Sequence, residues 1–274
     1  MNDLARRVRN TGRIAVALGK RDLRIAWSYR ASFVFGYLGV FSGLFIFYFV
    51  SKIIGPTDEF QTPEEYFRFA AIGMALAALV ETALAAAMES ARGEQVQGTL
   101  EALATLPVTG LSLGLGWVTL PLVNGILSAA VTVLLAIPFG LAGVDPNWFS
   151  VFVALLLSTA VFGSLGMIGA GIVLAFQQGG GIIGLITGGL ALVSGTVFPI
   201  SVFPSWIRWL ADISPLRYAL DASRGAAING QSISELHTSL LALVGFLVVL
   251  GPIGIVTIEA GMRHARRVGS LGRF

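Results

Sequence analysis

The sequence contains no cysteine, only two histidines and few charged residues. Of its 274 residues, 12% are charged and 55% are hydrophobic, and the mean hydropathy is +0.81. Without cysteine the chain forms no disulfide and no thiolate metal site, and His237 and His264 are too far apart in sequence to predict a histidine site. Because roughly a quarter of the residues in soluble proteins are charged, this composition indicates an integral membrane protein.

The sequence also lacks the motifs of a self-sufficient pump or enzyme. Its only lysines are Lys20 and Lys52, and it has no G-x-x-x-x-G-K-[ST] phosphate loop, no G-x-S-x-G and no H-E-x-x-H. We therefore expect no catalytic residue, no bound cofactor and no ATP hydrolysis by this chain alone. The net charge of +3 favours contact with lipid over nucleic acid, because most basic residues flank apolar runs and no recognition module is present.

Six apolar runs are long enough to cross a bilayer. They cover residues 31–54, 66–88, 111–139, 148–176, 182–203 and 236–258. The predicted fold is thus an all-α membrane protein with six transmembrane helices and both termini on one side. Thirteen of the 18 basic residues lie on the side of the termini, which predicts a cell-membrane protein whose termini are cytoplasmic. No cleavable signal peptide is expected, because the early apolar stretch "IAVALG" is short.

Two domains are predicted, residues 1–30 and residues 31–274. The first is a basic amphipathic helix that lies on the membrane, with Arg13, Lys20 and Arg24 along one stripe and apolar residues along another. It is either a plain topological anchor or a specific docking element. The second is the six-span domain.

Glu81, in "AALVETALAA", is the single carboxylate well inside a span. Intramembrane acids are costly and usually functional or paired. Glu81 is therefore expected either to relay protons or contact a cationic substrate, or to make a structural hydrogen bond between spans.

Two further patterns indicate packing surfaces within the spans. Gly180, Gly184 and Gly188 present a bare helical face, which lets a helix of this chain or of a second copy approach closely. Tyr37, Phe41 and Phe45 belong to an aromatic stripe with a four-residue repeat. That stripe suits core or lipid packing, a substrate path or a dimer interface.

The polar segment "GEQVQGTLEALATLPVTG", residues 93–110, interrupts the apolar chain between the second and third spans. A helix over about 94–106 would place Val96, Leu100 and Leu103 on one side and Glu94, Gln97 and Glu101 on the other. This helix is too short to span the bilayer. It therefore suits either a docking site for a separate motor protein or an interfacial helix that rests on lipid.

A second polar segment, "FPISVFPSWIRWLADISPLRYALDASRGAAING", precedes the sixth span. Within it, "PSWIRWLADI" predicts a short amphipathic helix, and its tryptophans favour the outer headgroup level. Residues 199–230 are accordingly predicted to form an outer re-entrant segment.

Together with the six spans, these two segments resemble the type 2 ATP-binding-cassette (ABC) exporter permeases. The first has the order Glu94, Gly98-Thr99-Leu100-Glu101, Leu103, Thr105 and Pro107, and the second has Phe198-Pro199, Pro204, Trp206, Pro215-Leu216, Tyr218, Asp221 and Arg224. Gln95 and Gln97 depart from the charged residues that are frequent in relatives. The resemblance implies a permease that dimerises and binds two ATPase subunits, which hold ATP and Mg.

The resemblance also implies roles for particular residues. The ATPase-coupling residues would be Glu94, Gly98, Thr99, Leu100, Glu101, Leu103, Leu106 and Pro107. A second docking contact would involve Arg13, Lys20, Arg21 and Arg24. The outer gate would contain Phe198, Pro199, Trp206, Trp209, Pro215 and Tyr218.

The expected function is the export of an amphipathic drug, lipid or lipid-linked glycan, driven by a separate ATPase. Two alternatives stay open from the sequence. One is a proton-coupled secondary transporter that uses Glu81, and the other is a membrane assembly factor that transports nothing.

Overall fold

The computed structural model describes residues 30–57, 59–99, 109–141, 145–176, 189 and 195–268. This part of the chain is built from helices and contains no strand, as the predicted fold class requires. In chain order the elements are α2 (Arg30–Ile53), α3 (Pro63–Val96), α5 (Gly110–Ala136), the 3-10 helix η1 (Ile137–Phe139), α6 (Trp148–Phe176), the 3-10 helix η2 (Ile200–Val202), α8 (Ser205–Asp212), α9 (Pro215–Ala227) and α10 (His237–Val268).

Four of the described helices are long and apolar enough to cross a membrane: α3, α5 with η1, α6, and α10 up to Ala265. They correspond to the second, third, fourth and sixth predicted spans. The 24 residues of α2 match the first predicted span within one residue at each end, although its apolar part, Leu38–Ile53, is shorter. Most of the predicted fifth span lies outside the described residues, so the count of six stays a prediction.

The end of the predicted fifth span is wrong. Residues 195–199 form turns, and only η2 follows before Phe203. The physical reason is local, because Gly195 adopts a left-handed φ of 74° and Pro199 has no amide hydrogen to donate within a helix.

The long helices begin at sequence signals that cap them. Thr62 accepts a hydrogen bond from the amide of Glu65, and Pro63 occupies the first turn of α3. Thr109 and Ser112 form a reciprocal capping box at the start of α5. The 34 residues of α3 extend for about 51 Å, which exceeds the roughly 30 Å of a bilayer core. One helix therefore reaches past the apolar layer.

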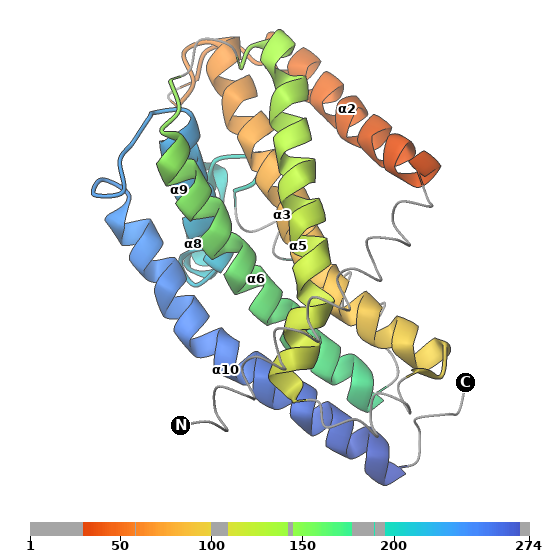
Figure 1. Cartoon of the computed structure of the whole chain (residues 1–274). Helices are drawn as coiled ribbons and strands as arrows, with labels where there is room; N and C mark the ends of the chain where they lie inside the picture. Colours follow the sequence, from red (N-terminus) through yellow and green to blue (C-terminus); the bar gives the residue numbers. More distant parts are fainter. Residues whose placement is uncertain are drawn as a thin grey trace.

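The long helices run the length of the molecule, with α3, α6 and α10 in one direction and α5 in the opposite direction (Figure 1). Helix α9 packs on α3 and α6, and α8 lies against α9 about midway along the molecule; the end at which α3 begins we call the α9 end. At the other end α3 finishes just before Gly98, and we call this the Gly98 end. Among the helix pairs, α6 and α10 pack against each other most extensively.

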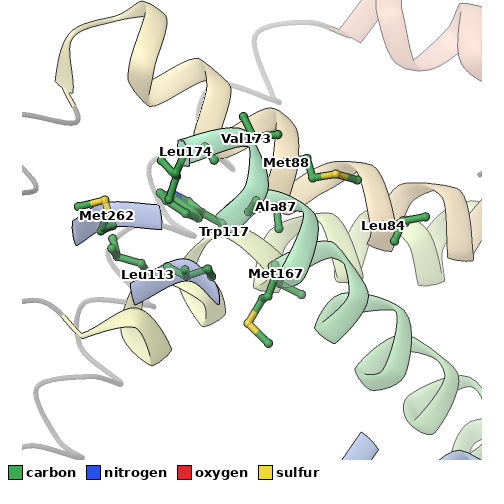
Figure 2. Close-up of a cluster of buried hydrophobic side chains, with 13 residues drawn as sticks. Leu84, Ala87, Met88, Leu113, Trp117, Met167, Val173, Leu174 and Met262 are labelled. Atoms are coloured by element: carbon green, nitrogen blue, oxygen red, sulfur yellow. The ribbon is translucent and has the colours of Figure 1, made fainter. Parts of the chain in front are cut away.

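A dense apolar core fills the bundle towards the Gly98 end. Trp117 of α5 is fully buried, with Leu113, Leu174 of α6 and Met262 of α10 around it (Figure 2). The whole cluster, here called the Trp117 core, comprises Leu84, Ala87, Met88, Ala91, Leu113, Trp117, Val118, Met167, Ala170, Val173, Leu174, Ile258 and Met262. Four long helices are thus joined at this end.

Candidate functional site: a cavity that contains Glu81

A cavity of about 520 Å³ lies between α2, α3, α5 and the segment that follows Gly195. Its lining residues are Gly39, Val40, Met74, Ala77, Ala78, Glu81, Thr132, Gly195, Thr196, Val197, Phe198 and Phe203. We call it the Glu81 cavity, because Glu81 supplies the one carboxylate among its described lining residues. Its volume lies in the usual range for ligand pockets, roughly 300–1,000 Å³. The intramembrane acid singled out from the sequence therefore lies in a space that suits a small ligand.

A second pocket, of about 420 Å³, lies towards the α9 end, where α2 ends and α3 begins. Its lining includes Glu59, Tyr66, Phe198 and Pro199, and we call it the Tyr66 pocket. The hydroxyl of Tyr66 is buried and makes no hydrogen bond within the described part of the chain. Phe198 lines both the pocket and the Glu81 cavity, so the two spaces share one aromatic residue.

Arg224 of α9 fastens the cavity wall to α3. Its Nη1 donates to the carbonyl of Gly195 at 3.1 Å, and its Nη2 donates to that of Thr196 at 2.6 Å. Its Nε donates to the carbonyl of Phe69 at 3.3 Å, and the guanidinium carbon lies 3.4 Å from the centroid of the Phe69 ring. Only the planar, many-donor group of arginine can hold three carbonyls and stack on an aromatic ring at once.

The Arg224 side chain is half-buried, and the charge of Asp221, which precedes it by three residues on α9, acts on it. Burial lowers its pKa to about 9, and the charge of Asp221 opposes that shift. The pKa still lies above neutral pH, so Arg224 remains protonated and keeps its donors.

Gly73 of α3 is the surface on which this wall rests. A Cβ at position 73 would lie 1.9 Å from the carbonyl oxygen of Thr196 and 2.6 Å from Nη2 of Arg224. Real side chains do not tolerate such distances, so the bare backbone of Gly73 is required for the wall segment to approach α3.

The predicted outer-gate residues separate into three groups, of which Pro215 and Tyr218 form the third. Phe198 and Pro199 line the cavities, whereas Trp206 and Trp209 of α8 line neither and are 71% and 57% exposed. The predicted short helix in "PSWIRWLADI" is confirmed as α8.

Pro215 and Tyr218 hold the turn between α8 and α9. Pro215 is buried at the start of α9, and the hydroxyl of Tyr218 donates to the carbonyl of Asp212 at 2.9 Å. These two residues stabilise the turn before α9, the helix that carries Arg224, and neither of them lines a cavity.

The aromatic stripe of α2 lies against η1. The rings of Phe41 and Phe45 stack at 6.1 Å, and both also pack against Phe139. Neither lines the Glu81 cavity, to which α2 contributes Gly39 and Val40. The side chain of Tyr37 lies outside the described residues.

The start of the predicted coupling helix is wrong, because residues 94–96 are the last turn of α3. Glu94 and Gln95 are buried and Val96 is 62% exposed, so in this last turn the polar residues face inward and the apolar residue faces outward. The packing of α3 on α6 sets this orientation. Nε2 of Gln95 donates to the carbonyls of Val173 and Leu174 at 3.4 and 3.5 Å, near the end of α6.

Gly98 ends α3 in a left-handed turn with a φ of 69°. The amide of Gly98 donates to the carbonyl of Gln95 at 3.1 Å, and the hydroxyl of Thr99 donates to Glu94, as a helix-ending turn requires. A Cβ on Gly98 would meet nothing within 4 Å of this chain, so the left-handed backbone conformation explains the glycine.

Several predicted site residues lie outside the described residues. They are the coupling residues Leu100, Glu101, Leu103, Leu106 and Pro107, the docking residues Arg13, Lys20, Arg21 and Arg24, and the glycine face of Gly180, Gly184 and Gly188. Their roles stay predictions.

Sequence reasoning missed the two residues that shape the cavity wall, Gly73 and Arg224. The sequence identified Arg224 only as a position in a family-like order and gave no reason to single out Gly73. A possible signal was an arginine surrounded by alanine and glycine in "DASRGAA", which indicates a guanidinium close to backbone.

The described part of the chain contains no group of three histidine or acidic residues that could hold a metal ion. It instead contains a set of apolar, bilayer-length helices around a ligand-sized cavity. These features define a multi-pass membrane protein.

A family model for ABC-2 type transporters matches residues 15–228, more than half of the chain. The chain therefore belongs to the ABC-2 type transporter family. Members of this family are transmembrane permease components that work with ATP-binding-cassette ATPases. No match to this chain was found among curated proteins.

Proposed function

We propose that this protein is the membrane subunit of an ATP-driven exporter, in which two copies pair and bind two separate ATPase subunits. The substrate is amphipathic, in the class of drugs, lipids or lipid-linked glycans, and leaves the cytoplasm. Membership of the ABC-2 type family supports the transporter class. The observation that carries the proposed mechanism is that the single helix α3 connects the Gly98 end with the Glu81 cavity.

The Gly98 end is the cytoplasmic end in this proposal, in agreement with the excess of basic residues in the predicted cytoplasmic segments. From Glu81 to Gln97 a helix rises about 24 Å, at 1.5 Å per residue. A force on the segment after Gln97 would therefore act directly on the cavity wall. The Gln95 amide also joins the last turn of α3 to α6, so the two helix ends would move together.

Residues 100–107 form the proposed binding site for the ATPase subunit. Leu100 and Leu103 would enter an apolar groove on that subunit, as amphipathic helices do. Replacing both with aspartate would bury charge in the contact and should abolish co-purification of the ATPase. Gln97→Ala, at the rim, is the matched control and should leave binding within about twofold of wild type.

The experiment needs a fold control, namely membrane insertion and dimerisation of the double mutant. Full ATPase binding by a well-inserted Leu100→Asp, Leu103→Asp protein would show that the segment rests on lipid. Hydrolysis of ATP by the purified chain without a partner would contradict the proposal that a separate subunit hydrolyses ATP.

A second candidate function is proton-coupled transport, which the position of Glu81 in the cavity favours. The two mechanisms differ in their energy source. Substrate uptake into inside-out vesicles that requires ATP and persists after the pH gradient is dissipated supports the first and excludes the second.

A further inference from the structure

Glu81 has no counter-charge among the residues that the structure describes. It makes no hydrogen bond or ion pair with the residues that the structure describes. Arg224, the cation that fastens the wall segment, already uses its Nε, Nη1 and Nη2 on the carbonyls of Phe69, Gly195 and Thr196. A carboxylate at membrane depth is costly unless a cation or hydrogen-bond donor compensates it.

Thr132, a polar residue of the lining, does not compensate Glu81 either. The hydroxyl of Thr132 donates to the carbonyl of Ser128 at 2.8 Å within its own helix. No lysine, arginine or histidine occurs among the described lining residues of the Glu81 cavity. The described part of the wall thus has a negative site without a positive partner.

The remaining walls suit an apolar body. Val40, Met74, Ala77 and Ala78 face the cavity from two helices, and Phe198 adds an aromatic ring that can attract a cation through its π face. Methionine adapts its shape to irregular ligands. A bulky apolar molecule that carries one positive charge would bury its body against these walls and place its charge at Glu81.

We propose that the Glu81 cavity binds an amphipathic monovalent cation and that Glu81 is the residue that selects its charge. This narrows the substrate class of the exporter and rests on the proposed function for its physiological meaning. Binding itself requires neither ATP nor the ATPase subunit, so it can be tested separately.

The test uses the full chain in lipid nanodiscs with two probes of equal shape and opposite charge, tetraphenylphosphonium and tetraphenylborate. Equilibrium binding of each radiolabelled probe is measured for the wild type, Glu81→Gln and Glu89→Gln. Glu89 is an exposed carboxylate two turns further along α3 and does not line the cavity, so Glu89→Gln loses the same charge elsewhere. We expect at least a tenfold loss of phosphonium affinity for Glu81→Gln and less than a twofold change for Glu89→Gln.

A second variant keeps the test valid if Glu81→Gln fails to fold. A Cβ at Gly39 would meet nothing within 4 Å, so Gly39→Phe should fill part of the cavity without a backbone clash and should reduce phosphonium binding while Glu81 is intact. Unchanged phosphonium affinity in well-folded Glu81→Gln, or in Gly39→Phe, overturns the proposal. Equal binding of tetraphenylborate and tetraphenylphosphonium overturns it as well.

Failure here is distinguishable from failure of the exporter proposal. Loss of the cation site with ATPase co-purification retained would leave an exporter whose ligand is not a cation. Cation binding by a chain with which no ATPase co-purifies would support the site and contradict ATP-driven export.

Discussion

Helix α3 passes through two regions that differ in packing. Near the Gly98 end, Leu84 and Met88 are buried in the Trp117 core among side chains from three other helices. About a turn earlier, Glu81 lines a cavity of about 520 Å³. Close-packed interiors transmit displacement as rigid bodies, whereas hollow regions change shape. The comparison indicates that one part of α3 is built to transfer motion and the neighbouring part to receive a ligand.

The largest effect is expected for Trp117→Ala, which removes the ring at the centre of the dense region. The cavity left behind should lower the free energy of unfolding by about 3–5 kcal/mol. Thermal unfolding in nanodiscs measures the loss. Trp206→Ala, at a position 71% exposed, is the control and should change stability by less than about 0.5 kcal/mol. Equal losses for the two variants would show that the dense core is not special.

Arg224→Met should have the next largest effect, because it leaves carbonyls of the cavity wall without their donor. We expect a loss of about 1–3 kcal/mol of stability together with loss of tetraphenylphosphonium binding. Arg224→Lys should restore little, since an ammonium group cannot reproduce the planar set of donors.

Arg208→Met is the matched control for Arg224→Met. Arg208 also donates to two backbone carbonyls, those of Ser201 and Phe203, but these bonds are exposed and water can replace them. Thermal unfolding and phosphonium binding of this variant should remain close to wild type. If Arg208→Met is as harmful as Arg224→Met, burial of the wall bonds is not what matters.

A smaller effect, with opposite signs at two positions, is expected at the end of α3. Gly98→Ala should destabilise the protein by about 1–2 kcal/mol, because alanine is strained at a φ of 69°. Gly93→Ala lies within the helix, where a Cβ would come no closer than 3.9 Å to the Gln97 side chain, and should stabilise it by up to about 1 kcal/mol. Changes of the same sign, measured by thermal unfolding, would rule out the proposed turn.

The smallest effect on stability is expected for Phe198→Ala, at a side chain that is 57% exposed. Unfolding free energy should change by less than about 0.5 kcal/mol. Loss of the ring that both cavities share should nevertheless accelerate the release of bound tetraphenylphosphonium several-fold. An unchanged release rate, measured by dilution of the labelled probe, would separate Phe198 from the ligand path.

Much of the helical framework could be predicted from apolar run length, since a bilayer demands about 20 residues per span. Glu81 was identifiable because a carboxylate inside such a run is rare. Helix α8 followed from two tryptophans between Pro204 and Pro215.

The cavity wall could not be predicted, because it depends on contacts between distant residues. The bond from Arg224 to Phe69 joins positions 155 residues apart, and no local pattern encodes it. Glu94 was placed on the wrong side for a related reason. A helix period shows which residues share a face, but packing on α6 decides which face of α3 turns inward.

Gly39 and Gly73 have opposite freedom to vary, although both are glycines near the same wall. Any side chain at position 73 would collide with the Thr196 carbonyl, whereas position 39 opens into space. Natural variation in ligand size is therefore expected to accumulate on α2 and to spare the α3 side at Gly73. In a lineage that changes its substrate, the size of the Glu81 cavity would change through substitutions on α2. The wall held by Arg224 would be retained.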